Sequence, residues 1–165
     1  MSTSNDRRFY SGEDRYLKAI RTQQGGYASS RVEYCDTIYT VQGDVVYPNE
    51  SAFNEAVALL SANPMIAMRF GVTTPPNFHL STNRNRTSSA YRRGGGIVIA
   101  RTKGMMTKHI LLHELAHYIV HVTKPERESH GPEFRRVLGI LIQDHVGQGN
   151  ADLFRALTED AVAEV

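Results

Sequence analysis

The chain has 165 residues, 41% of them hydrophobic, one cysteine and a formal net charge of +2 at neutral pH. A chain of this size buries about 70% of its unfolded surface, so it needs no disulfide to fold. The small charge argues against an obligatory polyanionic partner, and one cysteine excludes an intramolecular disulfide and a cysteine-rich zinc site. No apolar run approaches the roughly 18 residues of a membrane span. We therefore expect a cytoplasmic protein without a membrane partner, with a disordered N-terminus over residues 1–10 and a single domain over residues 11–165.

The first half of the chain contains signals for two helices and several short strands. Apolar residues recur at helical spacing in two segments, and segments rich in Ile, Tyr and Val indicate strands. In chain order, the predicted elements are a helix from residue 11 or 12 to 24, a strand–turn–strand unit over 37–47 with its turn at Gly43-Asp44, a helix from residue 49 or 51 to 62, a strand over 65–72 and a short strand over 78–81.

A segment rich in arginine follows over residues 83–93, and it contains Tyr91 together with Arg84, Arg86, Arg92 and Arg93. Guanidinium groups pair with phosphates and stack on bases, so the segment is a candidate contact for nucleic acid or for an acidic substrate. A solvated loop explains the same composition, and the low net charge favours that interpretation.

The second half of the chain predicts one strand followed by three helices. Residues 97–100 are expected to form a strand after a glycine run, and residues 105–122 are apolar on nearly every face, as in a buried central helix. Pro125 ends this helix, and Pro132 suits the first position of the next one. Helices over 132–145 and from residue 150 or 152 to 163 complete an α+β fold with about five helices and a small mixed or antiparallel sheet.

The central helix contains the sequence His-Glu-Leu-Ala-His over residues 113–117. On a helix, His113 and His117 lie about 40° and 6 Å apart, so both imidazoles can reach one tetrahedral metal ion. Glu114 lies beside that face, where it can take a proton from a water molecule on the metal. The alternative is a helix that carries two stacked histidines by chance. Burial of unpaired His and Glu side chains costs free energy, and a divalent cation would offset that cost. His109 and His121 lie about 12 Å along the axis from one member of the pair, so we expect them to have packing or helix-end roles.

A metal ion at this pair needs a third protein ligand, and His130 is the best candidate. It follows the turn that ends the central helix and directly precedes the next helix, where a side chain can point back. Glu126, Glu128 and Glu133 are the alternatives, although an acidic residue at position 133 also suits the first turn of a helix.

The motif His-Glu-Leu-Ala-His, a gap of twelve residues and then His-Gly-Pro-Glu-Phe resembles the SprT/Spartan-type zinc metallopeptidases. The ends of the chain resemble a smaller group, the short uncharacterised metallohydrolases of actinobacteria and their phages: residues 8–14 are similar to the opening of that group and residues 152–157 to its close. The resemblance implies a single zincin-like domain in which the helix after the active-site helix carries the third ligand at its start. It also implies one Zn²⁺ per chain, with His113, His117 and His130 as its ligands and Glu114 as general base.

By this resemblance, the reaction is the hydrolysis of a peptide bond by zinc-bound water, with a peptide or protein as substrate. The oxyanion needs a further donor, and Tyr91, Tyr118 and the arginines over 84–93 are the candidates. The strand before the central helix either pairs with an extended substrate or is an ordinary interior strand. A non-proteolytic amide hydrolase and a zinc-stabilised binding module without catalysis are the alternative functions.

Overall fold

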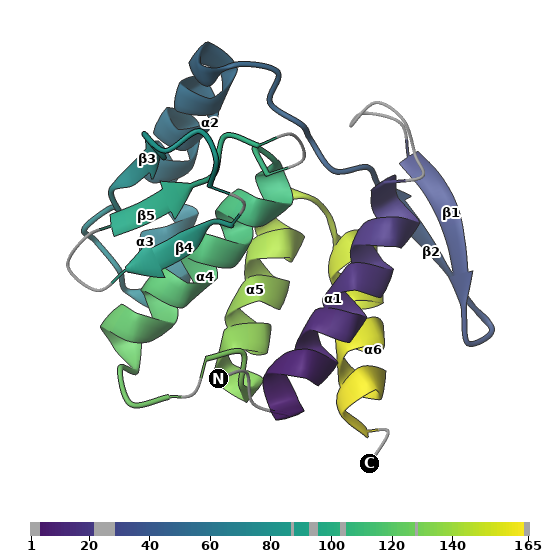
Figure 1. Cartoon of the computed structure of the whole chain (residues 1–165). Coiled ribbons are helices and arrows are strands. Elements are labelled where there is room, and N and C mark those ends of the chain that lie inside the picture. Colours follow the sequence, from purple (N-terminus) through teal and green to yellow (C-terminus); the bar gives the residue numbers. More distant parts are fainter. Residues whose placement is uncertain are drawn as a thin grey trace. The chain divides into compact units, whose positions relative to one another are not determined.

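A computed structural model describes residues 4–21, 29–86, 88–92, 96–102, 105–127 and 129–163. Within these ranges the chain forms six helices and two small sheets, which confirms the predicted α+β class (Figure 1). None of the helices in these ranges has the length and apolarity that a membrane crossing requires. The chain divides into two compact units, residues 1–44 with 127–165 and residues 45–126.

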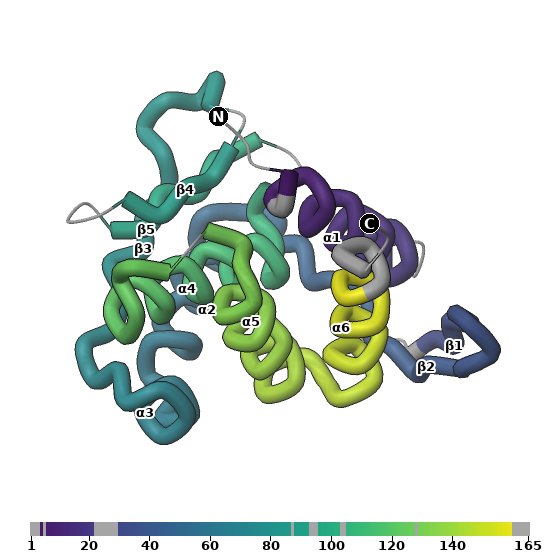
Figure 2. The backbone as a smooth tube through the Cα atoms, turned by 90° about the horizontal axis from the view of Figure 1, so that it is seen from below, coloured from purple at the N-terminus to yellow at the C-terminus, as the bar shows by residue number. Residues whose placement is uncertain are grey.

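The first unit combines three helices with one hairpin. Its elements are α1 (Ser4–Arg21), β1 (Ser29–Tyr34), β2 (Thr37–Gln42), α5 (Pro132–His145) and α6 (Gln148–Ala163). Helix α6 contacts α1, α5 and β2, and Figure 2 shows it beside α1 and α5. Phe9, Phe134 and Phe154 are fully buried where these helices meet, with the ring of Phe9 edge-on to both others. Edge-on aromatic contacts add to the stabilisation that burial of the rings provides.

Helix α1 begins at Ser4, seven residues before the predicted start at residue 11. Residues 4–10, expected to be disordered, are therefore helical, while residues 1–3 and the predicted helix end at residue 24 lie outside the described residues. The physical reason is that Phe9 belongs to the same apolar stripe as Tyr16 and Ile20, and all three side chains are buried. From Phe9 to Ile20 the stripe packs α1 against the unit over about three turns.

The hairpin turns at Cys35-Asp36, so the predicted turn at Gly43-Asp44 is wrong. The φ angles of Cys35 and Asp36 are 48° and 61°, which is the conformation of a two-residue type I′ turn. Strand β1 precedes this turn and was not predicted. Residue Val46, expected in a second strand, forms only an isolated antiparallel bridge with Thr107.

The second unit contains α2 (Glu50–Ala62), α3 (Met65–Phe70), β3 (Phe78–Leu80), β4 (Ala90–Arg92), β5 (Gly96–Ile99) and α4 (Lys108–Thr123). Its three strands form a mixed sheet in the order β3-β5-β4, with β5 parallel to β3 and antiparallel to β4. Helix α4 contacts β4 and β5. The sheet thus covers part of the helix that carries the His-Glu-Leu-Ala-His sequence.

The prediction of a strand over residues 65–72 is wrong, because this segment contains the short helix α3. The side-chain oxygen of Asn63 accepts a hydrogen bond from the backbone N–H of Met65 at 2.9 Å, which satisfies one free donor of the first turn. Gly71 ends the helix with a φ of 70°, a conformation that favours glycine. Ile66 is buried whereas Met68 is exposed, so the apolar run is not buried on both faces as an interior strand would be.

Candidate metal centre

Helix α4 starts at a well-defined cap. The hydroxyl of Thr107 accepts a hydrogen bond from the backbone N–H of Ile110 at 3.2 Å, and the N–H of Lys108 donates to the carbonyl of Val45 at 2.9 Å. Both bonds satisfy donors that a helix start leaves free. Residues 111–116 are all buried, which agrees with the prediction of a central helix that is apolar on nearly every face.

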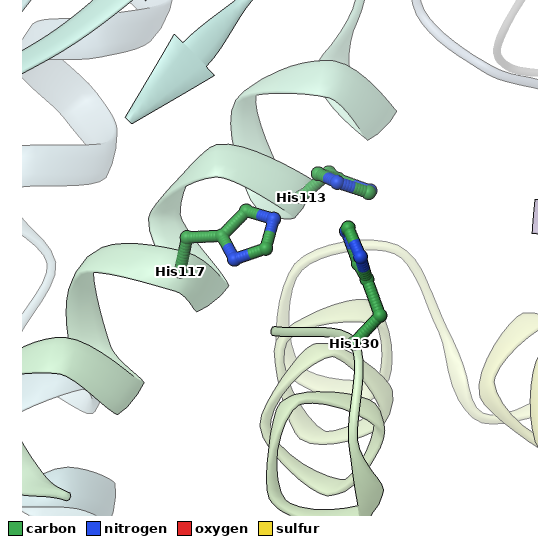
Figure 3. Close-up of side chains that lie close together, drawn as sticks. All are labelled: His113, His117 and His130. Atoms are coloured by element: carbon green, nitrogen blue, oxygen red, sulfur yellow. The ribbon is translucent and has the colours of Figure 1, made fainter. Parts of the chain in front are cut away.

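His113 and His117 lie on one face of α4, as their spacing predicts. Their ring centroids are 5.1 Å apart, with the ring planes inclined by 66°. His113 and Glu114 are each only 6% exposed, and His117 is half-buried. Figure 3 shows the rings of His113 and His117 on successive turns of α4, and it also labels His130, which precedes the N-cap of α5.

His130 directly precedes Gly131, the N-cap of α5. Its φ is 55°, in the left-handed region, which few residues other than glycine adopt and in which asparagine, aspartate and histidine are the most frequent of them. The side chain is 6% exposed. Strain of this kind persists only where the surroundings fix the residue, and it is concentrated at functional sites. Residue 130 is therefore held in one orientation at a cost in backbone free energy.

The ring of His130 is fixed by residues of α1 and α5. Asp6 Oδ1 lies 3.0 Å from Nδ1 of His130, and the ring of Phe9 stacks on the imidazole at a centroid distance of 5.1 Å. The ring of Phe134 meets the imidazole edge-on at 4.8 Å. A carboxylate only accepts hydrogen bonds, so in the neutral imidazole the proton lies on Nδ1 and Nε2 keeps its lone pair. This tautomer is the one that a metal ion at Nε2 requires.

Tyr10, like Asp6, contacts His130, and the sequence alone did not predict either contact. Its hydroxyl oxygen lies 3.3 Å from Nε2 of His130, and the two ring centroids are 4.7 Å apart. Asp6 and Tyr10 are four residues apart on α1, so they share one face of that helix. The signal in the sequence was this spacing, but it is visible only if the helix is extended back to Ser4.

Tyr91 and Tyr118, the tyrosines predicted as oxyanion donors, meet edge-on at a ring-centroid distance of 5.8 Å. Tyr118 donates its hydroxyl proton to the carbonyl of Thr74 at 2.8 Å, so that proton already has an acceptor. Tyr91 lies on β4, so the prediction of a loop is wrong at this position, and its ring is also tilted against His121 at 5.5 Å. His121 thus has the packing contact expected of it.

The arginines predicted as nucleic-acid contacts occupy surface positions where the structure describes them. Arg84 and Arg92 are exposed, and Arg86 is half-buried with its Nε donating to the carbonyl of Ser88 at 2.5 Å. Arg93 lies outside the described residues. Arg86 with its local hydrogen bond fits a polar loop, whereas Arg92 is the last residue of β4. Contact with nucleic acid stays a prediction.

The acidic alternatives to His130 differ in their surroundings. Glu133 accepts two hydrogen bonds from the guanidinium of Arg136, at 2.6 and 3.2 Å, and this bonding raises the pKa of Arg136. Glu126 is exposed, and Glu128 lies outside the described residues. The carboxylate of Glu133 is therefore already engaged with a cation on its own helix.

Strand β5, which directly precedes α4 in the described part of the chain, is the central strand of its sheet. It pairs with β3 on one side and β4 on the other, as an interior strand does. Of the two readings that the sequence left open for it, the interior strand is therefore the correct one. An extended substrate would have to pair with an edge strand.

Comparison with known proteins gives a family match over the segment that contains the candidate site. Residues 97–148 match the model of the SprT-like family, and this segment contains α4, His130 and α5. No curated protein and no solved structure matches the chain. The match confirms the resemblance inferred from the motif. Over residues 97–148 the chain is similar to the SprT-like family, which is of the zincin-like metallopeptidase type.

Proposed function

We propose that the protein is a zinc-dependent peptidase in which His113, His117 and His130 bind one zinc ion and Glu114 is the general base. The observation that carries this proposal is the His113–His117 pair on one face of α4 with the buried carboxylate of Glu114 next to it, inside the segment that matches the SprT-like family. Each of the three histidines offers one ring nitrogen that could ligate a metal ion.

The donor set fits zinc. Neutral imidazoles are typical zinc ligands, and three of them leave one coordination position open, as catalytic zinc sites do. The contact between Asp6 and Nδ1 of His130 fits as well, because histidine ligands of zinc commonly donate their second ring proton to a carboxylate. A purely structural site would need a fourth protein ligand and would gain nothing from a base beside it.

Zinc at this position would polarise the scissile carbonyl and lower the pKa of a water molecule toward 7. Glu114 accepts the proton of the attacking water and then donates it to the leaving amine. Glu114 is 6% exposed, so bulk water competes little for the proton that its carboxylate holds between the two transfers. His113 and His117 are one helical turn apart and stay rigidly spaced through the reaction because α4 is buried.

Hydrolysis of fluorescently labelled casein by zinc-loaded protein tests the proposal. We expect cleavage by the wild type, and we expect Glu114→Gln to keep about one zinc ion per chain while losing hydrolysis by at least about 100-fold. Glu55→Gln, at an exposed position of α2, is the matched control and should behave as the wild type does. A Glu114→Gln variant with the wild-type rate would exclude Glu114 as the base.

The same experiment separates the alternative functions. Cleavage of a small amide such as an amino-acid p-nitroanilide, with casein left intact, would indicate a non-proteolytic amide hydrolase. Zinc-dependent stability without any hydrolysis would indicate a binding module. We also propose a cytoplasmic location, which the exposed thiol of Cys35 supports because such a thiol suits a reducing compartment.

A further inference from the structure

We propose that a pocket between α5 and α6 binds a small organic phosphate, a phosphate monoester that carries a compact apolar group. The pocket has a volume of about 270 Å³, and both helices contribute to its walls. Its lining residues are Pro132, Arg135 and Arg136 from α5 and Arg155, Thr158 and Glu159 from α6. All of them belong to the first unit. The site uses no metal ion, so the inference goes beyond the proposed function and does not depend on it.

Arg135 supplies the pocket with a cation that lacks an anionic partner in the described part of the chain. The residue is half-buried, and its Nε is enclosed by protein without a hydrogen-bond acceptor. Its guanidinium forms no ion pair with a described carboxylate. A guanidinium group is always charged, and partial removal of a charge from water without a partner costs free energy. An anion bound in the pocket would offset that cost.

The other two arginines of the pocket are held by polar side chains that do not line it. Arg136 donates two hydrogen bonds to Glu133, at 2.6 and 3.2 Å. Arg155 donates to Oε1 of Gln143 at 3.2 Å, and its Nη1 lies 3.7 Å from Oδ1 of Asp152. A guanidinium carries five N–H donors, so each group keeps donors that these bonds do not use. Both cations are therefore fixed in direction before a ligand arrives, which lowers the entropic cost of binding.

The charge and size of the pocket indicate the class of ligand. Its lining contains three arginine cations and one carboxylate, that of Glu159. A phosphate monoester, with a charge of about −2 at neutral pH, balances the excess. Guanidinium groups bind the oxygens of such an anion through paired N–H donors. The volume of about 270 Å³ is close to the roughly 300 Å³ at which small-molecule sites begin, so the pocket has room for an organic group beside the phosphate.

Calorimetric titration of the full chain with phenyl phosphate tests the inference. We expect saturable binding by the wild type with a Kd below about 1 mM, and binding at least about 10-fold weaker by Arg135→Gln. Arg31→Gln, at an exposed position of β1, is the matched control and should bind as the wild type does. Absence of saturable binding in the wild type, or equal affinities of Arg135→Gln and the wild type, would overturn the inference.

The same comparison distinguishes this pocket from the proposed zinc centre. Phosphate oxygens can also ligate zinc, but binding of that kind would not depend on Arg135. Phenyl phosphate that binds the wild type and Arg135→Gln equally well therefore counts against the pocket. Failure of the protein to take up zinc or to cleave casein, in contrast, leaves the expected titration unchanged.

Glu159→Gln provides a test in which the affinity should rise. Glu159 is exposed, so its substitution should not disturb folding, and its carboxylate repels an anion in the pocket that it lines. We expect this variant to bind phenyl phosphate about 3-fold more tightly than the wild type. Glu55→Gln removes the same charge at an exposed position of α2 and should leave the affinity unchanged. Unchanged or weaker binding by Glu159→Gln would contradict the placement of the phosphate in this pocket.

Two further probes test the chemical class of the ligand. Inorganic phosphate lacks the apolar group and benzoate carries only one negative charge, so each should bind the wild type at least about 5-fold more weakly than phenyl phosphate does. Inorganic phosphate that binds as tightly as phenyl phosphate would show that the pocket does not recognise an organic group. Benzoate that binds more tightly would show a carboxylate site, and either result would overturn the assignment to an organic phosphate.

Discussion

The carboxylate of Asp6 lies 3.0 Å from Nδ1 of His130, across 124 residues of sequence. Helix α1 thereby supplies the hydrogen-bond acceptor that orients the imidazole of His130, just before the start of α5. The side chain of Asp6 is only 14% exposed, so water screens this pair weakly. The proposed third ligand is thus held by a residue that the local motif does not include.

Loss of this acceptor should weaken zinc binding. We expect Asp6→Ala to lower zinc affinity about 10- to 100-fold in competition with a chromophoric chelator, because the imidazole loses its fixed tautomer and orientation. Asp14→Ala, at an exposed position of the same helix, is the control and should bind zinc as the wild type does. Equal affinities of Asp6→Ala and the wild type would show that Asp6 has only a structural role, such as stabilising the first turn of α1.

Close packing of α6 on the hairpin predicts a large effect at Gly149. A Cβ atom at this position would overlap the carbonyl oxygen of Thr40 and lie 2.9 Å from its carbonyl carbon. Gly149→Ala should therefore destabilise the protein by about 3 kcal/mol, since the backbone of β2 must move. Thermal unfolding followed by circular dichroism measures this loss.

Gly147→Ala is the matched control for this prediction. Its added Cβ would meet only Asn150 Oδ1, at 4.0 Å, so the melting temperature should stay within a few degrees of the wild-type value. Equal stabilities of the two variants would show that Gly149 at the start of α6 does not pack closely against the Thr40 backbone of β2.

Burial of Tyr16 predicts a loss of stability at alkaline pH. Burial raises the pKa of Tyr16 above its usual value of 10.0, and the hydrogen bond from Asn150 opposes this only in part. The folded state therefore binds the phenolic proton more tightly than the unfolded state does. This contribution is fully present below about pH 10 and is lost as the pH rises through the folded-state pKa, by up to about 1.4 kcal/mol per pH unit.

Denaturant unfolding of the wild type and Tyr16→Phe at pH 8 and pH 11 measures this contribution. The variant should be less stable at pH 8, because Asn150 loses a hydrogen-bond acceptor, but it should lose less stability between the two pH values. An equal loss in both proteins would contradict the assignment of this pH dependence to Tyr16.

Local patterns predicted the part of the site that lies on one helix. The spacing of His113 and His117 fixes their common face wherever α4 forms, and the buried run around them made that helix easy to predict. Pro132 likewise marked the start of α5, one residue after Gly131. The positions of these elements required no knowledge of tertiary contacts.

Contacts between distant segments could not be predicted in the same way. Residues 4–10 are mostly polar, and their helix is stabilised by Phe9, which packs against α5 and α6 rather than against its own neighbours in sequence. Asp6 and Tyr10 were missed for that reason. The prediction for residues 65–70 is wrong because a short apolar run fits a strand or a helix equally well. In the structure, the bond from the N–H of Met65 to Asn63 Oδ1 and the C-cap at Gly71 favour the helix.

X-ray absorption spectroscopy at the zinc edge tests the central claim most directly, because it reports the ligands of the bound ion. For the wild type we predict three imidazole nitrogens and one light oxygen donor at about 2.0–2.1 Å, and one imidazole fewer in His130→Ala. A zinc shell with only two imidazoles in the wild type, or a shell that His130→Ala leaves unchanged, would contradict the three-histidine centre.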